Sequence, residues 1–404
     1  MSGTRRWLCG LVLAAVAGLV TVPIAPAQPA HAALACPQQK SITDPLPDRP
    51  WPLRRLRPDL VWPLTTGEGI VVAVIDSGTS HNHPALKGQV LAGADFLEPG
   101  GIGDCDEAGH GTIIAGIIAG LKTGDSGFHG VAPGAKILPI RVLRDDKRET
   151  TGDAPIRIAN AIRTATDRGA DVINLSLTTA PTPALESAVE YAVSHNVVVV
   201  AAAGNLTAAP QPGTKPAPMY PAAYPGVIGV AGVDENGDHV PSSVFGDWVD
   251  IAAPGLAIAG PAPRGGGYAT YDAGGTSFAA AYVSGTVALL RAFRSDLTAA
   301  AVARRILATA DRPADGWDEF VGNGVVNPYW AISSIPENET GIETLGKITL
   351  PDPVADPLSR TRVVATFATL GSVGLSVLVL TGAWVLRRGR RRGWRPGRDE
   401  IYSA

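Results

Sequence analysis

The fold follows from one stretch of sequence, Ile70-Val71-Val72-Ala73-Val74-Ile75-Asp76-Ser77-Gly78. Six consecutive apolar residues predict a strand that is covered on both faces, as in a parallel sheet. Apolar runs of the same kind recur at residues 136–143, 171–175, 197–203 and 227–233. Residues 154–169 and 182–196 have helical spacing and are long enough for the crossovers between parallel strands. The sequence therefore predicts an α/β fold with a mainly parallel central sheet flanked by helices.

The composition indicates a large globular domain with appendages. Of 404 residues, 45% are hydrophobic and 18% are charged, which supports a sizeable core and excludes a largely disordered chain. The formal net charge is only -3, but seven arginines lie within the last eighteen positions. The two ends therefore differ in character from the middle.

The N-terminus has the layout of a secretory signal peptide over residues 1–35. Arg5 and Arg6 precede an uncharged apolar run from Trp7 to Val22, and small residues follow up to Ala35. An uncleaved membrane anchor is the alternative, but the apolar run is short for one. We therefore expect export, with cleavage between Ala32 and Ala35.

Export also bears on the cysteines. Cys9 would leave with the signal peptide, so the mature chain keeps Cys36 and Cys105. Two cysteines in an exported protein suggest one disulfide, and two unrelated thiols are the alternative. A bridge would tie the start of the mature chain to the segment just before His110.

Near the C-terminus, residues 363–386 form a run of 24 residues without a charge, predicted to be a transmembrane helix. As a helix it would be about 36 Å long, enough to cross a bilayer. A buried soluble helix is the alternative, but arginines begin at once with Arg387, as expected of a cytoplasmic flank. Residues 387–404 are thus predicted to be a basic cytoplasmic tail of a cell-membrane protein whose main domain is extracytoplasmic. This flank explains the arginines without a nucleic-acid partner.

Two proline-containing segments bound the main domain. Residues 36–63 contain seven prolines, too many for a helix or a central strand, and predict an extended arm that wraps the domain. Residues 331–362 predict a linker to the transmembrane helix. The domain between them, residues 64–330, is expected to be catalytic for the reasons that follow.

Candidate catalytic residues stand where strands end or helices begin, which is where sites form in parallel sheets. Asp76 ends the first strand, His110 opens an apolar helix, and Ser277 precedes another after Gly274-Gly275. A serine nucleophile, a histidine base and an orienting carboxylate together make a hydrolytic triad. Asn205 follows a strand end and can donate its side-chain NH2, with the Ser277 N–H, to an oxyanion. Singly, such residues are more often turn formers and helix caps.

Taken together, these strings resemble the subtilisin-like serine proteases, or subtilases. The resemblance rests on Asp76-Ser77-Gly78, His110-Gly111-Thr112, Gly130-Val131-Ala132-Pro133, Ala203-Gly204-Asn205 and Gly275-Thr276-Ser277. It implies the three-layer subtilisin-like fold and hydrolysis of peptide bonds through an acyl-enzyme. With its signal peptide, arm, cysteine pair and C-terminal helix, the chain looks like the mycosins, proteases associated with type VII secretion.

The mycosin resemblance implies a membrane-anchored serine endopeptidase that processes polypeptide substrates of type VII secretion and supports the secretion complex. The alternative is a catalytically dispensable scaffold of that membrane complex. Substrate binding is expected at Leu175, Ser176, Leu177 and Thr178, an extended segment that can pair with a peptide backbone. Ala203, Gly204 and Met219 are also expected to bind substrate. Met219 stands where many subtilases have a small residue at the floor of the specificity pocket, so the resemblance implies a narrowed pocket that prefers small residues before the scissile bond.

No metal and no cofactor are expected. Calcium is the usual structural ion of subtilases, but Ala85 stands where a ligating Asp is common. The acidic residues Asp104, Asp106 and Glu107 are interpreted as a solvated loop, because a hard cation needs several convergent oxygens.

Overall fold

The computed structural model describes residue 36, residues 41–144, 152–208, 214–334 and 359–391, and residue 393. The chain divides into two compact units, residues 1–336 and 337–404, which are treated separately below. The predicted signal peptide, most of the predicted linker and most of the predicted tail lie outside the described residues.

The first unit is built on a seven-stranded sheet in the order β2-β3-β1-β4-β5-β6-β7, in which all neighbouring strands are parallel. The strands are β1 Val71–Asp76, β2 Ala94–Asp95, β3 Lys136–Arg141, β4 Val172–Leu175, β5 Val198–Ala202, β6 Val227–Val233 and β7 Ile251–Pro254. The predicted parallel sheet is therefore confirmed. Because β1 lies between β3 and β4, its carboxyl end lies among those of other strands and away from the two outer strands of the sheet.

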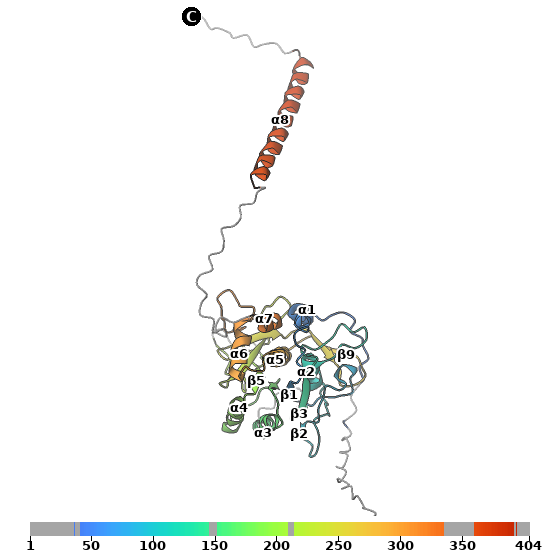
Figure 1. Cartoon of the computed structure of the whole chain (residues 1–404), viewed down its shortest axis with the longest axis vertical. Helices are drawn as coiled ribbons and strands as arrows, with labels where there is room; N and C mark the ends of the chain where they lie inside the picture. The colour runs from blue at the N-terminus through green and yellow to red at the C-terminus, as the bar shows by residue number, and fades with distance from the viewer. Residues whose placement is uncertain are drawn as a thin grey trace, which may run out of the picture. The chain divides into compact units, whose positions relative to one another are not determined.

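Helices cover both faces of this sheet (Figure 1). The helices α3 Ala154–Asp167 and α4 Pro183–Ser194 lie on one face, and α2 His110–Ala119 and α5 Thr276–Phe293 lie on the other. Side chains of β1 alternate between the two faces, as a strand requires. Val72 and Val74 pack with α2 and α5, whereas Ala73 and Ile75 pack with α3 and α4. This two-sided burial explains why the strand is apolar throughout.

Smaller elements complete the first unit. They are the helices α1 Trp51–Leu56, α6 Ala299–Ala308 and α7 Pro328–Ser333, the 3-10 turns η1 Pro58–Leu60 and η2 Pro84–Leu86, and an antiparallel pair of strands, β8 Ile258–Pro261 and β9 Tyr268–Tyr271. The second unit contains α8 Ser359–Arg391. Within α8, the stretch Ala368–Arg391 is long and apolar enough to cross a membrane, and an 18-residue window within it has a mean hydropathy of 1.8.

Within the predicted extended arm, the described residues 41–50 contain no helix, whereas later residues do. Ile42 donates its N–H to the carbonyl of Arg264 at 3.1 Å, and Asp44 accepts from the N–H of Tyr268 at 3.0 Å, so this part lies along β9 and the turn before it. Residues 51–56, however, form α1. Pro52 stands in the first turn, where a helix needs no N–H from it, so it does not prevent the helix. Leu53 and Leu56 of α1 are part of the core.

Element ends also differ from the predictions. The run predicted to be a strand over residues 136–143 leaves the sheet after Arg141. Residues 331–333, which were predicted to begin the linker, are instead the end of α7, where Ala331 and Ile332 are buried. Apolar patterning does not separate a strand or helix from buried residues that follow it.

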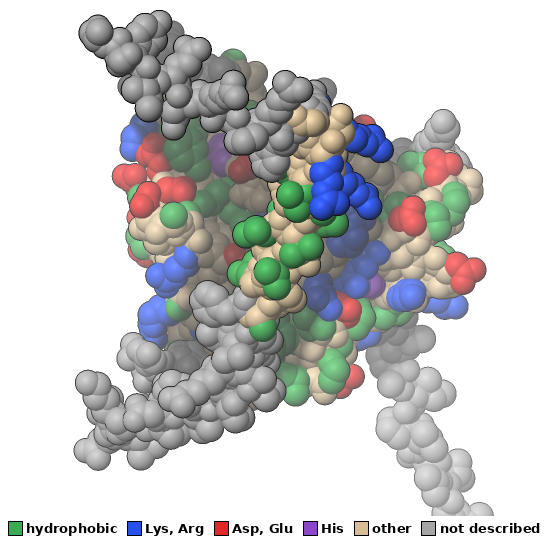
Figure 2. Space-filling model, turned by 90° about the horizontal axis from the view of Figure 1, so that it is seen from above, with side chains coloured by type: hydrophobic (Ala, Val, Ile, Leu, Met, Phe, Trp, Pro, Cys, Tyr) green, Lys and Arg blue, Asp and Glu red, His purple; other side chains and the backbone are tan. Residues whose placement is uncertain are grey.

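Charged side chains of both signs are interspersed with apolar ones on the face shown in Figure 2. Buried charges are more informative, because an ion inside a protein is costly unless it is paired. Among the described residues, the buried acidic and basic side chains include Asp76, Asp106, Arg141, Arg291 and Arg305. Three of these, Asp76, Asp106 and Arg141, lie in or beside the candidate site.

Candidate active site

The centre of the candidate site is a pair formed by Asp76 and His110. Oδ1 of Asp76 lies 2.8 Å from Nδ1 of His110, and their side chains are 0% and 9% exposed. Asp76 is the last residue of β1 and His110 is the first of α2, so two neighbouring elements bring them together. A carboxylate in this position holds the imidazole with its proton on Nδ1 and leaves Nε2 to accept one.

Two glycines allow these elements to approach closely. A Cβ on Gly78, whose φ is +107°, would lie 2.1 Å from the carbonyl oxygen of Cys105. A Cβ on Gly111 would lie 2.0 Å from the carbonyl oxygen of Gly78. Only glycine fits at such distances, and the strings Asp76-Ser77-Gly78 and His110-Gly111-Thr112 reflect this packing.

Ser277 is the second residue of α5, which packs against α2, the helix that begins with His110. The ring of Phe278, its neighbour in sequence, lies 5.6 Å from the ring of His110. The Ser277 hydroxyl donates to the carbonyl of Ser176 at 3.0 Å, and the Ser176 hydroxyl donates to the carbonyl of Ser277 at 2.7 Å. For nucleophilic attack, the Ser277 proton has to turn from that carbonyl to a base.

Asn205 lies next to the start of α5, with its amide oriented by Thr276. The Asn205 Oδ1 accepts from the Thr276 N–H at 3.0 Å and from the Thr276 hydroxyl at 3.2 Å. These bonds turn Nδ2 away from Thr276, and this nitrogen lies 3.2 Å from the point where a Cβ on Gly275 would stand. An amide donor is thus held beside the peptide that leads into Ser277.

The segment expected to bind substrate follows β4. Leu175 and Leu177 are buried residues, 0% and 7% exposed, so their side chains belong to the core. Ser176 contacts Ser277 through its carbonyl and its hydroxyl, and Thr178 is half-buried. The N–H of Thr179 donates to the carbonyl of Tyr220 at 2.8 Å, which joins this segment to the one that carries Met219.

The residues expected at the specificity pocket also lie together. Gly204 has a φ of +108°, and a Cβ there would lie 2.9 Å from Cγ of Met219. Ala203 is fully buried, and its carbonyl accepts from the Trp248 indole N–H at 3.4 Å. Met219 therefore lies over the Ala203–Gly204 backbone, where its side chain fills space.

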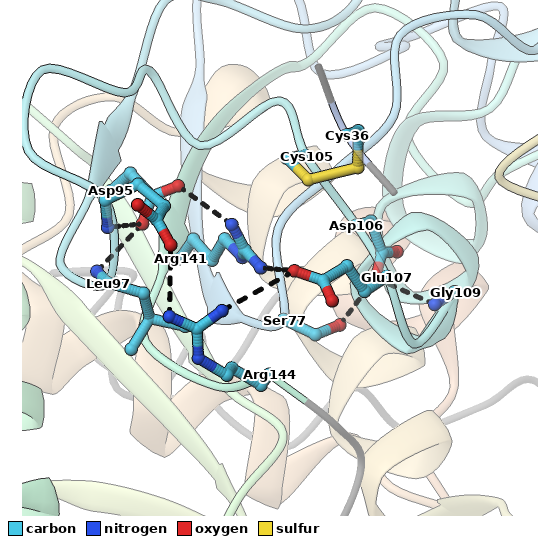
Figure 3. Close-up of polar contacts among 11 residues, drawn as sticks. Cys36, Ser77, Asp95, Leu97, Cys105, Asp106, Glu107, Gly109, Arg141 and Arg144 are labelled. Atoms are coloured by element: carbon cyan, nitrogen blue, oxygen red, sulfur yellow. Dashed lines mark hydrogen bonds and ion pairs between the residues drawn. A yellow bond between two sulfur atoms is a disulfide. The ribbon is translucent and has the colours of Figure 1, made fainter. Parts of the chain in front are cut away.

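The interpretation of the acidic residues before His110 as a solvated loop is wrong for Asp106, which is 3% exposed. Burial raises the pKa of Asp106 above its usual range, and the charge of Asp76 adds to this effect. Glu107 pairs with Arg141, and Arg141 also bonds Asp95 (Figure 3). The sequence could not indicate this burial, because the partners come from distant segments.

A second buried network was also missed from the sequence. Asn174 of β4 donates to the Ser176 hydroxyl at 2.9 Å and accepts from the hydroxyl of Ser284 of α5 at 2.9 Å. It fixes the end of β4 against α5 and thereby the place of Ser277. The only signal was a polar residue inside an apolar run.

Comparison with known proteins agrees with this geometry. Residues 67–324 match the subtilase family, Peptidase_S8. The chain is 37% identical over 383 residues to Mycosin-4 of Mycobacterium tuberculosis, covering 85% of this chain and 82% of that protein.

Solved structures give the same result. A serine protease MycP1, described as an essential component of the type VII (ESX-1) secretion system, aligns with a TM-score of 0.64 and 34% identity, covering 74% of this chain and 94% of that one. A chain of the periplasmic assembly from the ESX-5 inner membrane complex aligns with a TM-score of 0.64 and 30% identity, covering 79% and 94%. These likenesses confirm the predicted subtilisin-like fold. The chain belongs to the subtilase family of serine proteases and, within it, to the mycosins.

Proposed function

We propose that this serine protease hydrolyses peptide bonds with a triad of Ser277, His110 and Asp76. The observation that carries the proposal is the buried 2.8 Å contact between Asp76 and His110, together with the ring of Phe278, the residue after Ser277, 5.6 Å from the ring of His110. Ser277 attacks the carbonyl carbon while His110 takes its proton, and Asp76 stabilises the imidazolium that forms. His110 then gives the proton to the leaving amine, and water hydrolyses the acyl-enzyme by the same steps.

The developing oxyanion would be bound by Nδ2 of Asn205 and the backbone N–H of Ser277. The orientation of the Asn205 amide supports this role, because both bonds to Thr276 use Oδ1 and leave the NH2 for the substrate. The N-terminus of α5 adds a favourable field at the same point. Neither donor has to reorganise when the charge forms.

The substrate is a polypeptide that pairs with the segment from Leu175 to Thr178. Met219 over Gly204 supports a narrow pocket and a preference for small residues before the scissile bond.

We further propose that α8 anchors the protein in the cell membrane, with the catalytic domain extracytoplasmic and the basic tail cytoplasmic. The apolar stretch in α8 and the arginines at its end support this orientation. We also propose that the protein processes substrates of type VII secretion. The likeness to MycP1, a serine protease described as an essential component of the type VII (ESX-1) secretion system, supports this proposal.

A scaffold role is the second candidate, supported by the likeness to a chain of the ESX-5 periplasmic assembly.

Two experiments separate the roles. The full chain, purified in detergent, should hydrolyse members of a fluorogenic peptide library, and Ser277→Ala should reduce hydrolysis to background while Ser194→Ala, at an exposed helix end, should not. In cells, the gene is deleted and the loss of substrate secretion is measured. If expression of the Ser277→Ala chain restores secretion, the scaffold role is assigned. If it does not, proteolysis is essential.

A further inference from the structure

The carboxylate of Asp106 is buried against the two elements that carry Asp76 and His110. Its Oδ1 accepts from the Ser77 hydroxyl and from the N–H of Gly109, each at 2.8 Å. Its Oδ2 accepts from the N–H of Thr112 at 2.8 Å and from the Thr112 hydroxyl at 2.6 Å. All four partners donate, so the arrangement suits the ionised carboxylate.

Two of the residues that donate these bonds lie on either side of His110 in the sequence. Gly109 precedes it and Thr112 follows two residues later, and the N–H of Gly111 donates to the Ser77 hydroxyl at 3.0 Å. Gly109 has a φ of +81° and no side chain to cap α2, so Asp106 supplies the cap from three residues before it. The backbone on both sides of His110 is thereby fixed.

The same carboxylate reaches the turn after β1. Ser77, the neighbour of Asp76, donates its hydroxyl to Asp106 and its N–H to Oδ1 of Asp76 at 2.7 Å. A chain of hydrogen bonds thus leads from Asp76 through Ser77 and Asp106 to the first turn of α2. None of these bonds joins Asp106 to His110 itself. Asp106 acts on the backbone that carries His110.

The residues beside Asp106 are held from outside. Cys105 is bonded to Cys36, and Glu107 pairs with Arg141, which is 1% exposed (Figure 3). Covalent and ionic contacts on both sides keep the Asp106 side chain pointed inward. A buried charge at this place is costly, and its four donors and its anchored neighbours are what offset that cost.

We propose that Asp106 is a positioning residue for the reaction, which sets the distance and angle between Asp76 and His110 by joining the turn after β1 to the start of α2. This inference rests on the proposed triad. Misplacement of a catalytic group by about 1 Å can cost about 100-fold in rate without changing how substrate binds. Loss of Asp106 should therefore lower the rate of the chemical step and leave binding unchanged.

The test uses the full chain in detergent and a fluorophosphonate probe, whose covalent reaction at Ser277 needs a working base. For Asp106→Asn we expect the maximal labelling rate to fall by about 10- to 100-fold, with the probe concentration for half-maximal rate within about twofold of wild type. Asp104→Asn is the matched control on the same loop. Its carboxylate makes a 3.8 Å contact with His81, and the variant should label at the wild-type rate. Ser77→Ala should show the same pattern more weakly, and the double variant should lose less than the product of the two losses.

A labelling rate for Asp106→Asn within twofold of wild type would overturn the inference. So would a smaller labelled fraction that reacts at the wild-type rate, because that result assigns Asp106 to folding alone. If Asp106→Asn does not fold, an unchanged rate in Ser77→Ala overturns the inference instead. If the wild-type chain does not label, the result contradicts the triad itself. If the wild-type chain labels and Asp106→Asn labels at the same rate, the result contradicts only the role of Asp106.

Discussion

Asp76 and His110 are joined by a 2.8 Å contact, with the Asp76 side chain 0% exposed and the His110 side chain 9% exposed. The contact joins the end of a central strand to the start of a helix on one face of the sheet. In this environment the carboxylate both selects the tautomer of the imidazole and stabilises its cation.

Replacing the carboxylate by an amide should remove both effects. In Asp76→Asn we expect kcat to fall by about 10⁴-fold, because the amide favours the wrong tautomer of His110. KM and the melting temperature should change little, since the two side chains have the same shape. Steady-state kinetics on a fluorogenic peptide measures this, and a loss below tenfold would argue against the assigned role.

The oxyanion assignment predicts a different kinetic signature at Asn205. Asn205→Asp keeps the acceptor for Thr276 but replaces the NH2 donor, so kcat should fall by about 10²- to 10³-fold with little change in KM. Asn236→Asp, in an exposed turn, serves as the control. An Asn205→Asp chain as fast as this control would rule out the assignment.

Met219 should restrict the residue before the scissile bond. Because its side chain lies over Gly204, Met219→Ala should open the pocket and raise kcat/KM for large relative to small side chains by about 10- to 100-fold. A peptide-library cleavage profile measures this ratio. A wild-type profile dominated by large aromatic residues would contradict the narrow pocket.

The disulfide between Cys36 and Cys105 closes a loop over a sequence separation of 69 residues. In the chain-entropy model a loop of this length stabilises the folded state by about 4 kcal/mol. The double variant Cys36→Ser, Cys105→Ser should therefore melt at a lower temperature than wild type. Reductant should lower the melting temperature of wild type but not of the variant, and equal responses of the two would refute the prediction.

Asp250 predicts a pH dependence of stability. Burial raises the pKa of Asp250 from 3.8 to about 6, so the folded state binds its proton more tightly than the unfolded state does. The free energy of unfolding should then decrease as pH rises from about 4 through 6, by at most about 3 kcal/mol from this group. Asp250→Asn keeps an acceptor for the N–H of Gly229 and should raise the melting temperature at pH 7.5 but not at pH 4. An equal change at the two pH values would show that burial of the charge is not the cause.

Much of the fold could be predicted from periodicity, because strands covered on both faces are apolar throughout. The predicted bounds of β6, Val227–Val233, match the structure. The strands β8 and β9 were not predicted, since they are four residues each and form a small separate sheet. Helix α1 was missed because prolines were counted without regard to the first turn, where Pro52 is tolerated.

For the proposed site, the sequence indicated the candidate catalytic residues but not the residues that hold them in place. Asp76, His110, Ser277 and Asn205 stand in glycine-containing strings that are recognisable in one dimension. Asp106 was interpreted as a solvated residue, because its partners Ser77 and Thr112 become neighbours only when β1 and α2 pack. Supporting networks of this kind depend on tertiary contacts that periodicity does not encode.

The proposed triad is tested most directly by covalent labelling of the full chain with a fluorophosphonate, followed by mass spectrometry of the modified peptide. We expect one modified residue, Ser277, in wild type, and no modification in Ser277→Ala or in folded His110→Ala. Absence of labelling in a folded wild-type sample, or labelling at another serine, would contradict the assignment of Ser277 as the nucleophile.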